Sequence, residues 1–144
     1  MSFYTCLVVM VGGAIGTLAR YLVSVATLPI SRYLPRGTIF AINTLGSFII
    51  GFFGTLTLAH GRYPLSENAR LFVMIGLCGG YTTFSSFSLQ TLDLMRGEAW
   101  GRAFANIALS ILLCIGAVWL GHVLASRLND GAVEIVQTYI EEEA

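Results

Sequence analysis

The sequence predicts an all-α membrane protein with four transmembrane helices, the third of which is broken. Three observations lead to this fold class. Of the 144 residues, 56% are hydrophobic and 11% are charged, whereas soluble domains carry about 25% charged residues. Four apolar segments are each long enough to cross a hydrocarbon core of about 30 Å as a helix. A double glycine lies in the middle of the third segment, where it weakens helical structure.

The apolar segments are separated by short stretches with loop signals. They cover approximately residues 3–28, 38–59, 69–94 and 103–125. Prolines lie in the first two connections, and an Arg-Gly-Glu sequence lies in the third. An even number of crossings places both termini on the same side of the membrane. We expect residues 1–127 to form one transmembrane domain and residues 128–144, which contain three consecutive glutamates, to form an acidic tail.

The first segment combines a packing motif with a deep charge. Gly12 and Gly16 have the Gly-x-x-x-Gly spacing that lets a second helix approach closely. Arg20 lies well inside the segment, where an unpaired charge costs about 3 kcal/mol or more. Two roles remain open for this arginine: it attracts anions into an aqueous vestibule, or it bonds loop carbonyls or caps a helix end.

The second segment carries one amide, that of Asn43, which offers two donors without a formal charge. Its side chain is expected to face protein. An interhelical hydrogen bond and coordination of an ion are equally compatible with this position, because both place the amide inside a protein bundle and away from lipid.

The third segment is the one around which the protein is organised. Its double glycine, Gly79-Gly80, predicts a break near mid-segment, and backbone without helical hydrogen bonds at this depth must be covered by protein or by a watery cavity. A broken helix presents carbonyl groups suited to a cation and amide groups suited to an anion. Hydroxyl groups cluster nearby, which favours an ion path over the alternative of simple helix packing. They belong to Thr82, Thr83, Ser85, Ser86 and Ser88.

Aromatic and polar faces follow the break. Phe84 and Phe87 are three residues apart and therefore lie on one helical face. Such a pair usually serves packing, but the positive edges of aromatic rings can also face an anion. In the fourth segment Asn106, Ser110 and Cys114 recur every four residues and give one side of that helix a polar character.

Several classes of function are disfavoured. The net charge is zero and there is no lysine, so nothing attracts nucleic acid. The two histidines have no nucleophile or metal-ligand spacing beside them, and the three cysteines have no paired spacing, so an enzyme is not predicted. No carboxylate lies in the middle of a segment, as a proton-driven exporter of organic cations requires. A small anion is the favoured substrate, while an exporter of another solute and a scaffold subunit without transport remain as alternatives.

Three blocks of the sequence resemble the Fluc family, also called CrcB, of bacterial fluoride channels. They are GGAIGTLARY at residues 12–21, GTIFAINTLG at 37–46 and GGYTTFSSFS at 79–88. The resemblance extends over about residues 3–126. It implies a fluoride-selective channel that exports the anion passively across the cytoplasmic, or inner, membrane and so lowers intracellular fluoride.

The resemblance also implies an antiparallel, dual-topology homodimer with two pores and a structural sodium ion at its centre. Gly79 and Thr82 would supply carbonyls to the sodium ion, and Arg20 would lie in a vestibule. Asn43 would donate to fluoride, and Phe84 and Phe87 would form an aromatic box. Hydroxyls and the polar face of the fourth segment complete the predicted pore lining: Thr83, Ser85, Ser86, Ser88, Asn106 and Ser110.

The arginines near the ends of the segments are divided almost evenly between the two sides. Arg62, Arg70 and Arg127 flank one side, and Arg32, Arg36, Arg96 and Arg102 flank the other. Three against four is too even to set one orientation by the positive-inside rule, which makes insertion in both orientations and an antiparallel dimer possible. One orientation set by other features remains the alternative.

The chain departs from the family pattern at three positions: Gln90, where several members carry an acidic residue, Asn106, where some carry tyrosine, and Cys114, where serine is common. These departures leave the inner boundary of the pore lining open.

Overall fold

The structure is a computed structural model that describes residues 2–31, 37–58 and 62–129. Four helical stretches are long and apolar enough to cross a membrane: Phe3–Ala26, Gly37–Leu56, Glu67–Arg96 and Trp100–Leu128. The prediction of four crossings is thereby confirmed, and the chain is a multi-pass membrane protein. Most of the predicted acidic tail lies outside the described residues, as do Arg32 and Arg36.

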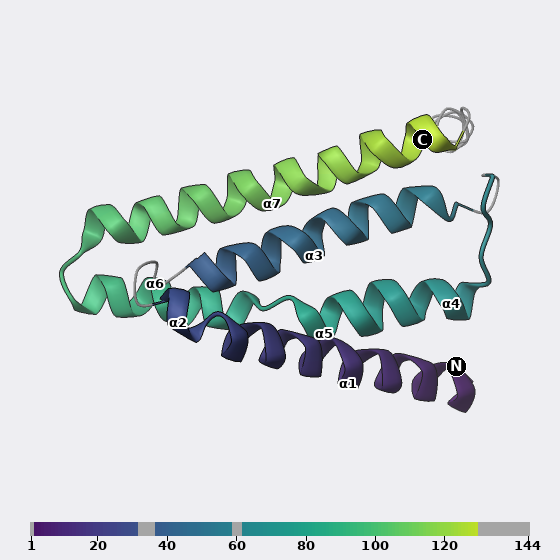
Figure 1. The fold of residues 1–144 in the computed structure, drawn as a ribbon, viewed down its shortest axis with the longest axis horizontal. Helices are drawn as coiled ribbons and strands as arrows, with labels where there is room; N and C mark the ends of the chain where they lie inside the picture. The colour runs from purple at the N-terminus through teal and green to yellow at the C-terminus, as the bar shows by residue number, and fades with distance from the viewer. Residues whose placement is uncertain (1, 32–36, 59–61, 130–144) are drawn as a thin grey trace.

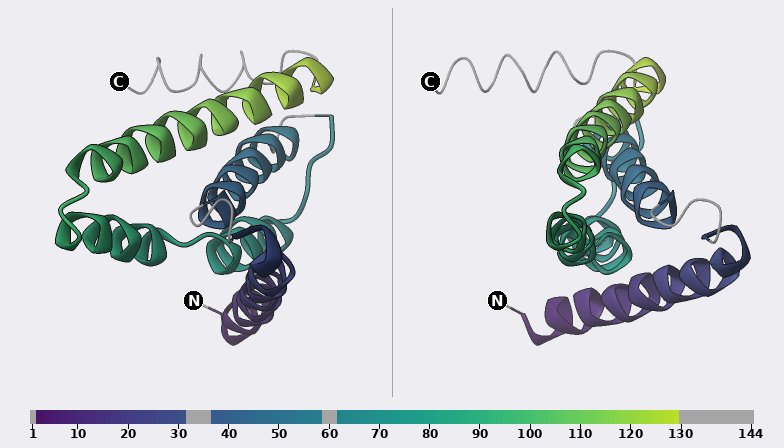
Figure 2. Two further views of the ribbon diagram at one scale, coloured as in Figure 1. Left: turned by 60° about the vertical axis from the view of Figure 1, so that its left-hand side comes forward. Right: turned by 90° about the vertical axis from the view of Figure 1, so that its left-hand side faces the viewer.

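The first and third crossings run in one direction and the second and fourth in the other, so the N-terminus and the end of the last helix lie at the same end (Figure 1). The elements, in chain order, are α1 (Phe3–Ala26), α2 (Leu28–Ser31), α3 (Gly37–Leu56), α4 (Glu67–Leu71), the π-helix η1 (Phe72–Cys78), α5 (Gly79–Tyr81), α6 (Phe84–Arg96) and α7 (Trp100–Leu128). The third crossing is built from α4, η1, α5 and α6. Helix α3 packs mainly on α7, and α1 packs mainly on η1 and α5 (Figure 2).

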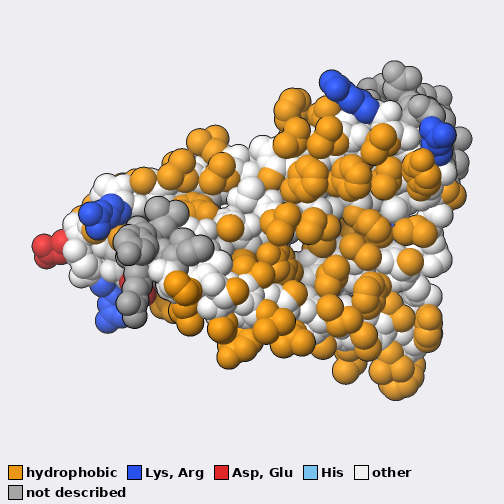
Figure 3. Space-filling model, in the orientation of Figure 1, with side chains coloured by type: hydrophobic (Ala, Val, Ile, Leu, Met, Phe, Trp, Pro, Cys, Tyr) orange, Lys and Arg blue, Asp and Glu red, His pale blue; other side chains and the backbone are white. Residues whose placement is uncertain are grey.

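The surface is apolar between the two ends of the molecule. Hydrophobic side chains cover most of the visible face, while arginine side chains lie at both of its ends and acidic side chains at its left end (Figure 3). Large apolar residues of α1 and α7 such as Leu18, Leu112 and Trp119 are exposed. Hydrocarbon rather than water is the solvent that such a surface fits, because exposing it to water would cost free energy in proportion to its area.

Glycines allow α1 to lie directly against the third crossing. A Cβ atom added to Gly16 would overlap the carbonyl oxygen of Leu77, and one added to Gly80 would lie 2.5 Å from the carbonyl oxygen of Gly13. Gly12 and Gly16 are both buried. The close approach predicted from the Gly-x-x-x-Gly spacing is therefore confirmed, and it is made against the π-helix and the short helix that precede the break.

The predicted break is present, but it lies after the double glycine rather than at it. Gly79 is helical, with φ −63° and ψ −38°. The next two residues are extended: Thr82 has φ −77° and ψ 158°, and Thr83 has φ −149° and ψ 104°. The reason is that Gly80 is needed for contact with α1, whereas the hydroxyl of Thr83 caps α6 by accepting a hydrogen bond from the backbone N–H of Ser86 at 3.1 Å.

The C-terminal end of α3 is held by side chains from two other elements. The guanidinium of Arg70 donates to the carbonyl oxygen of Gly54 at 3.2 Å and to the carbonyl and hydroxyl oxygens of Thr57. The buried side chain of Asn129 donates from Nδ2 to the carbonyl oxygen of Thr55 at 2.9 Å. These bonds satisfy carbonyl groups that the end of a helix leaves without partners. They connect α3 to α4 through Arg70 and to the end of α7 through Asn129.

Substituting Gly16 with alanine is expected to lower the free energy of unfolding by about 1–3 kcal/mol, because the new methyl group meets the backbone of Leu77. Gly13→Ala is the matched control: no atom lies within 4 Å of a Cβ at that position, so stability is expected to be unchanged or slightly higher. Thermal denaturation of the two variants in detergent measures the difference. Equal stabilities would contradict the assigned packing of α1.

Candidate functional site

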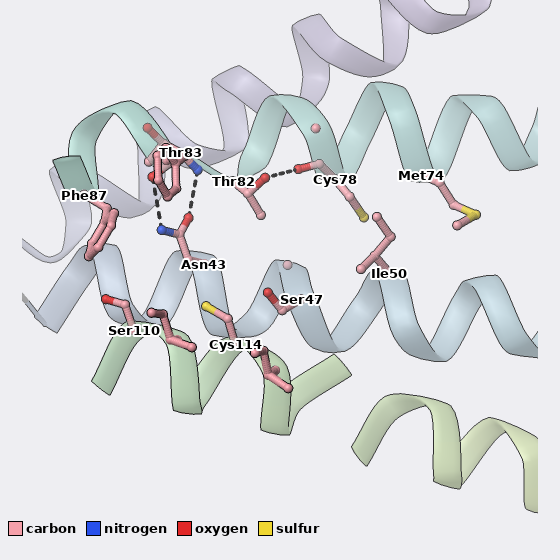
Figure 4. A pocket seen from close by; sticks show the side chains of 15 residues that line it. Asn43, Ser47, Ile50, Met74, Cys78, Thr82, Thr83, Phe87, Ser110 and Cys114 are labelled. Carbon is pink, nitrogen blue, oxygen red and sulfur yellow. Dashed lines mark hydrogen bonds between the residues drawn. The ribbon is translucent and has the colours of Figure 1, made fainter. Parts of the chain in front are cut away.

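A cavity of about 450 Å³ opens at the break in the third crossing, between that crossing and helices α3 and α7 (Figure 4). Its wall contains residues from all three of these parts of the chain. Among the residues predicted from the sequence, those that line it are Asn43, Gly79, Thr82, Thr83, Phe84, Phe87 and Ser110. Tertiary structure therefore brings together amide, hydroxyl and aromatic groups that are up to 67 positions apart, as between Asn43 and Ser110.

The amide of Asn43 and the peptide groups of Thr83 form a reciprocal pair of hydrogen bonds. The backbone N–H of Thr83 donates to Oδ1 of Asn43 at 2.8 Å, and Nδ2 of Asn43 donates to the carbonyl oxygen of Thr83 at 3.1 Å (Figure 4). A continuous helix would direct this N–H to the carbonyl oxygen of Gly79 instead. The pair thus satisfies the broken backbone from a neighbouring helix and releases the Gly79 carbonyl.

The two roles left open for Asn43 are compatible in this geometry. Its side chain does make an interhelical hydrogen bond, as one alternative expected. Nδ2 carries two N–H groups, and the second has no acceptor among the described residues. Because Asn43 lines the cavity, that second donor is available to a bound anion.

The two phenylalanines of α6 lie side by side at the cavity. Their ring centroids are 5.3 Å apart and the ring planes are inclined by 50°. Phe87 is half-buried, whereas Phe84 is 78% exposed. Tilted rings expose edge hydrogens in different directions, so the pair can present positive ring edges to the cavity.

The hydroxyl groups of the third crossing are divided between different surroundings. Thr83 is buried and lines the cavity, and its Oγ1 lies 2.9 Å from Oγ of Ser86 and 3.3 Å from Oγ of Ser85. Ser88 is exposed and donates to the carbonyl oxygen of Phe84 in its own helix at 2.9 Å. Ser85, Ser86 and Ser88 are not part of the cavity wall.

The polar face of α7 is likewise divided. Ser110 lines the cavity, and Cys114, one turn farther along, does so too. Asn106 does not: it is 4% exposed, and its Nδ2 donates to Oγ1 of Thr91 in α6 at 2.8 Å. Spacing of four residues predicted a shared face for these side chains, but α6 covers that face at Asn106 and leaves it uncovered at Ser110.

Arg20 lines a second cavity, of about 300 Å³, together with Tyr21, Ser24, Thr83 and Ser86. No hydrogen bond or ion pair links its guanidinium to another residue in the described ranges 2–31, 37–58 and 62–129. Capping of a helix end or bonding of a loop carbonyl by Arg20 is therefore absent from these parts of the chain. Thr83 belongs to the walls of both cavities, so the cavity that Arg20 lines adjoins the first one.

Sequence reasoning did not assign Ser47, Met74 or Cys78 to the site, although all three line the first cavity. A signal for Ser47 was present, since it follows Asn43 by four residues and shares its helical face. Within the described residues, no group of three or more histidine, cysteine or acidic side chains can hold a metal ion.

Comparison with known proteins identifies the family. A family model described as "CrcB-like protein, Camphor Resistance (CrcB)" matches residues 7–122. The "Fluoride-specific ion channel FluC" of Gluconobacter oxydans is 74% identical over 144 residues, the whole of both chains. The protein of the same name from Methylobacterium radiotolerans is 70% identical over 99% of both chains. The one from Methylocella silvestris is 57% identical over 84% of this chain and 92% of its own. The protein therefore belongs to the CrcB family.

Proposed function

We propose that this protein is a fluoride-selective channel that lets the anion leave the cell passively across the cytoplasmic membrane. The observation that carries the proposal is the cavity at the break, where uncharged donors and aromatic edges from three parts of the chain meet. The names of its close relatives, which describe an ion channel and not an enzyme, support the same substrate. An inside-negative membrane potential would drive fluoride outward without a nucleotide or a coupled ion.

The chemistry of the cavity suits a small, strongly hydrated anion. A selective pore must replace the water shell of the ion with close hydrogen-bond donors. The second N–H of Asn43 and the hydroxyl of Ser110 are neutral donors in the cavity wall. Ring edges of Phe84 and Phe87 add weak positive potential without a fixed charge that would hold the anion too tightly. Chloride is larger and holds its water less tightly, so it gains less from close donors than fluoride does.

We assign the cavity at Arg20 to the entrance of this path. A guanidinium without a partner among the described residues raises the local concentration of anions, and Ser86, which lines the same cavity, offers a hydroxyl to a partly dehydrated ion, whereas the hydroxyl of Thr83 donates to Ser86. Ser85 and Ser88 are exposed on the first turns of α6 and are candidates for the continuation of the polar track.

We further propose that the functional unit is an antiparallel homodimer with two pores, formed from copies inserted in opposite orientations. The 78% exposure of Phe84 supports this: an aromatic side chain at the cavity wall is left uncovered by its own chain. The near balance of arginines at the two ends favours neither orientation. A second copy related by a twofold axis in the membrane plane would cover Phe84 and complete each aromatic box.

A structural sodium ion at the centre of that dimer also fits the donor chemistry. The carbonyl of Gly79 loses its helical N–H partner because Thr83 donates to Asn43, and both Gly79 and Thr82 line the cavity. Carbonyl oxygens at the C-terminal end of a half-helix carry partial negative charge and are ligands that Na⁺ accepts. When bound, the ion would supply positive charge close to the path of the anion.

The alternatives derived from the sequence gain no support from the site. Among the residues that the structure describes, no acidic side chain lines the cavity, whereas a proton-coupled exporter of cations needs one. A scaffold subunit without transport does not require a cavity lined by hydrogen-bond donors, so the cavity does not favour that alternative.

The proposal is tested by reconstituting purified protein in liposomes loaded with fluoride and chloride. Fluoride is expected to leave rapidly and chloride to remain, as followed by ion-selective electrodes after a potassium ionophore is added. Equal release of both anions, or release of neither, would reject a fluoride-selective channel.

Phe87→Ile is expected to abolish fluoride release while the dimer still assembles, because the isoleucine retains bulk but has no ring edge. Efflux from liposomes and chemical cross-linking measure the two properties separately. The control is Phe104→Ile, at an exposed position of α7 outside the cavity, which is expected to conduct normally. Wild-type efflux from Phe87→Ile would count against the aromatic role.

Asn43→Leu is expected to lower fluoride efflux at least tenfold, since it removes both hydrogen bonds to Thr83 and the free donor in the cavity. Asn68→Leu is the matched control: the amide oxygen of Asn68 accepts a hydrogen bond from the hydroxyl of Thr5 in α1 at 3.1 Å, and neither residue lines the cavity. Efflux is measured for both. An equal reduction in the two variants would show that general destabilisation, not the site, explains the loss.

A further inference from the structure

We infer that Asn106 is a positioning residue for the aromatic pair: acting through Thr91, it holds the half-helix α6 that carries Phe84 and Phe87. The inference rests on the proposed function, since it assigns the pair its working position in a fluoride path. It replaces the role expected for Asn106 as part of the pore lining, because this side chain is absent from the cavity wall.

Helix α6 needs such support because it starts anew after the break. Its first residue, Phe84, follows two extended residues, so no continuous helix fixes the direction of its first turns. On the other side it is joined to α7 by a short turn. The buried seam between α6 and α7 consists of Thr91 and Leu94 on one helix and Ala103 and Asn106 on the other. Asn106 and Thr91 form the end of this seam that lies nearer the aromatic pair.

The two polar side chains of the seam form a relay to the backbone of Phe87. Nδ2 of Asn106 donates to Oγ1 of Thr91 at 2.8 Å, and Oγ1 of Thr91 donates to the carbonyl oxygen of Phe87 at 2.9 Å. The single hydroxyl proton of Thr91 is used in the second bond, so its oxygen is free to accept the first. A side chain of α7 is thereby connected to the main chain of the residue whose ring lines the cavity.

Burial makes this relay a strong constraint. Asn106 and Thr91 are 4% and 7% exposed. In such surroundings water cannot replace a lost partner, so the amide and the hydroxyl hold each other in place. One turn farther along α7, Ser110 reaches the cavity directly. On one face of α7, Asn106 therefore supports α6, and Ser110 in the next turn contacts the cavity.

The expected consequence concerns selectivity more than assembly. Without the relay, α6 can change its angle to α7, and the rings, whose centroids lie 5.3 Å apart, lose a defined position relative to Asn43. A looser set of donors and ring edges excludes the larger anion less well. We expect Asn106→Leu to lower the ratio of fluoride to chloride efflux at least tenfold in liposomes.

A double-mutant cycle tests whether the effect passes through Thr91. Thr91→Val keeps the shape of the side chain and removes the hydroxyl, so it is expected to lower the efflux ratio as Asn106→Leu does. The efflux ratio of the double variant is expected to be no lower than that of either single variant, because each substitution breaks the same relay. Thr91→Ser retains the hydroxyl and is expected to preserve the ratio.

The matched control is Thr55→Val, which removes another hydrogen bond to α7, made by a buried threonine and a half-buried histidine. Oγ1 of Thr55 lies 2.9 Å from Nδ1 of His122, near the opposite end of α7 and outside the cavity wall. This variant is expected to lose thermal stability comparably while its efflux ratio stays at the wild-type value.

A second readout does not depend on transport. With 4-fluorophenylalanine at position 87, the ¹⁹F NMR signal is expected to broaden or shift in Asn106→Leu and Thr91→Val but not in Thr55→Val. An unchanged signal and ratio in Asn106→Leu, or additive losses in the double variant, would overturn the inference. A loss in Asn106→Leu that Thr91→Val does not reproduce would instead indicate direct contact of Asn106 with the ion. If the wild-type protein releases no fluoride, the proposed function fails, while the NMR comparison still decides the positioning role.

Discussion

The rest of the structure depends on one exchange of hydrogen bonds, that between Asn43 and Thr83. Backbone inside a bilayer has no water to bond with, so a helix can be interrupted there only if another part of the protein satisfies the released groups. Asn43 does this with both ends of its amide, at 2.8 and 3.1 Å. The interruption in turn frees the carbonyl of Gly79, starts a new helix at Phe84 and opens a cavity between three crossings.

Small residues make this arrangement possible by letting helices approach backbone to backbone. Gly16 and Gly80 allow α1 to contact the last turns before the break, where even a methyl group would meet a carbonyl oxygen. The same contact places Arg20, one turn after Gly16, in the wall of a cavity that Thr83 also lines. Close packing of α1 is therefore also what brings a positive charge next to the interrupted backbone.

The site is uncharged and mostly apolar, with a few neutral polar groups in its wall. The cavity wall combines an amide, hydroxyls and ring edges, and the arginines of the described loops and helix ends lie away from it. Neutral donors can strip water from a small anion and still release it, whereas a fixed cation in the cavity would retain it. Support of these groups comes from buried residues outside the wall, as the pairing of Asn106 with Thr91 illustrates.

Composition and periodicity determined the fold class, the four crossings, the presence of a break and the shared face of Phe84 and Phe87, because each depends on residues adjacent in the chain. Tertiary structure alone decided where the break falls, since Gly80 is committed to α1 and Thr83 is free to cap α6. It also decided that Ser110 reaches the cavity and Asn106 does not. Periodicity identifies the face of a helix, but which neighbour covers that face depends on segments distant in the sequence.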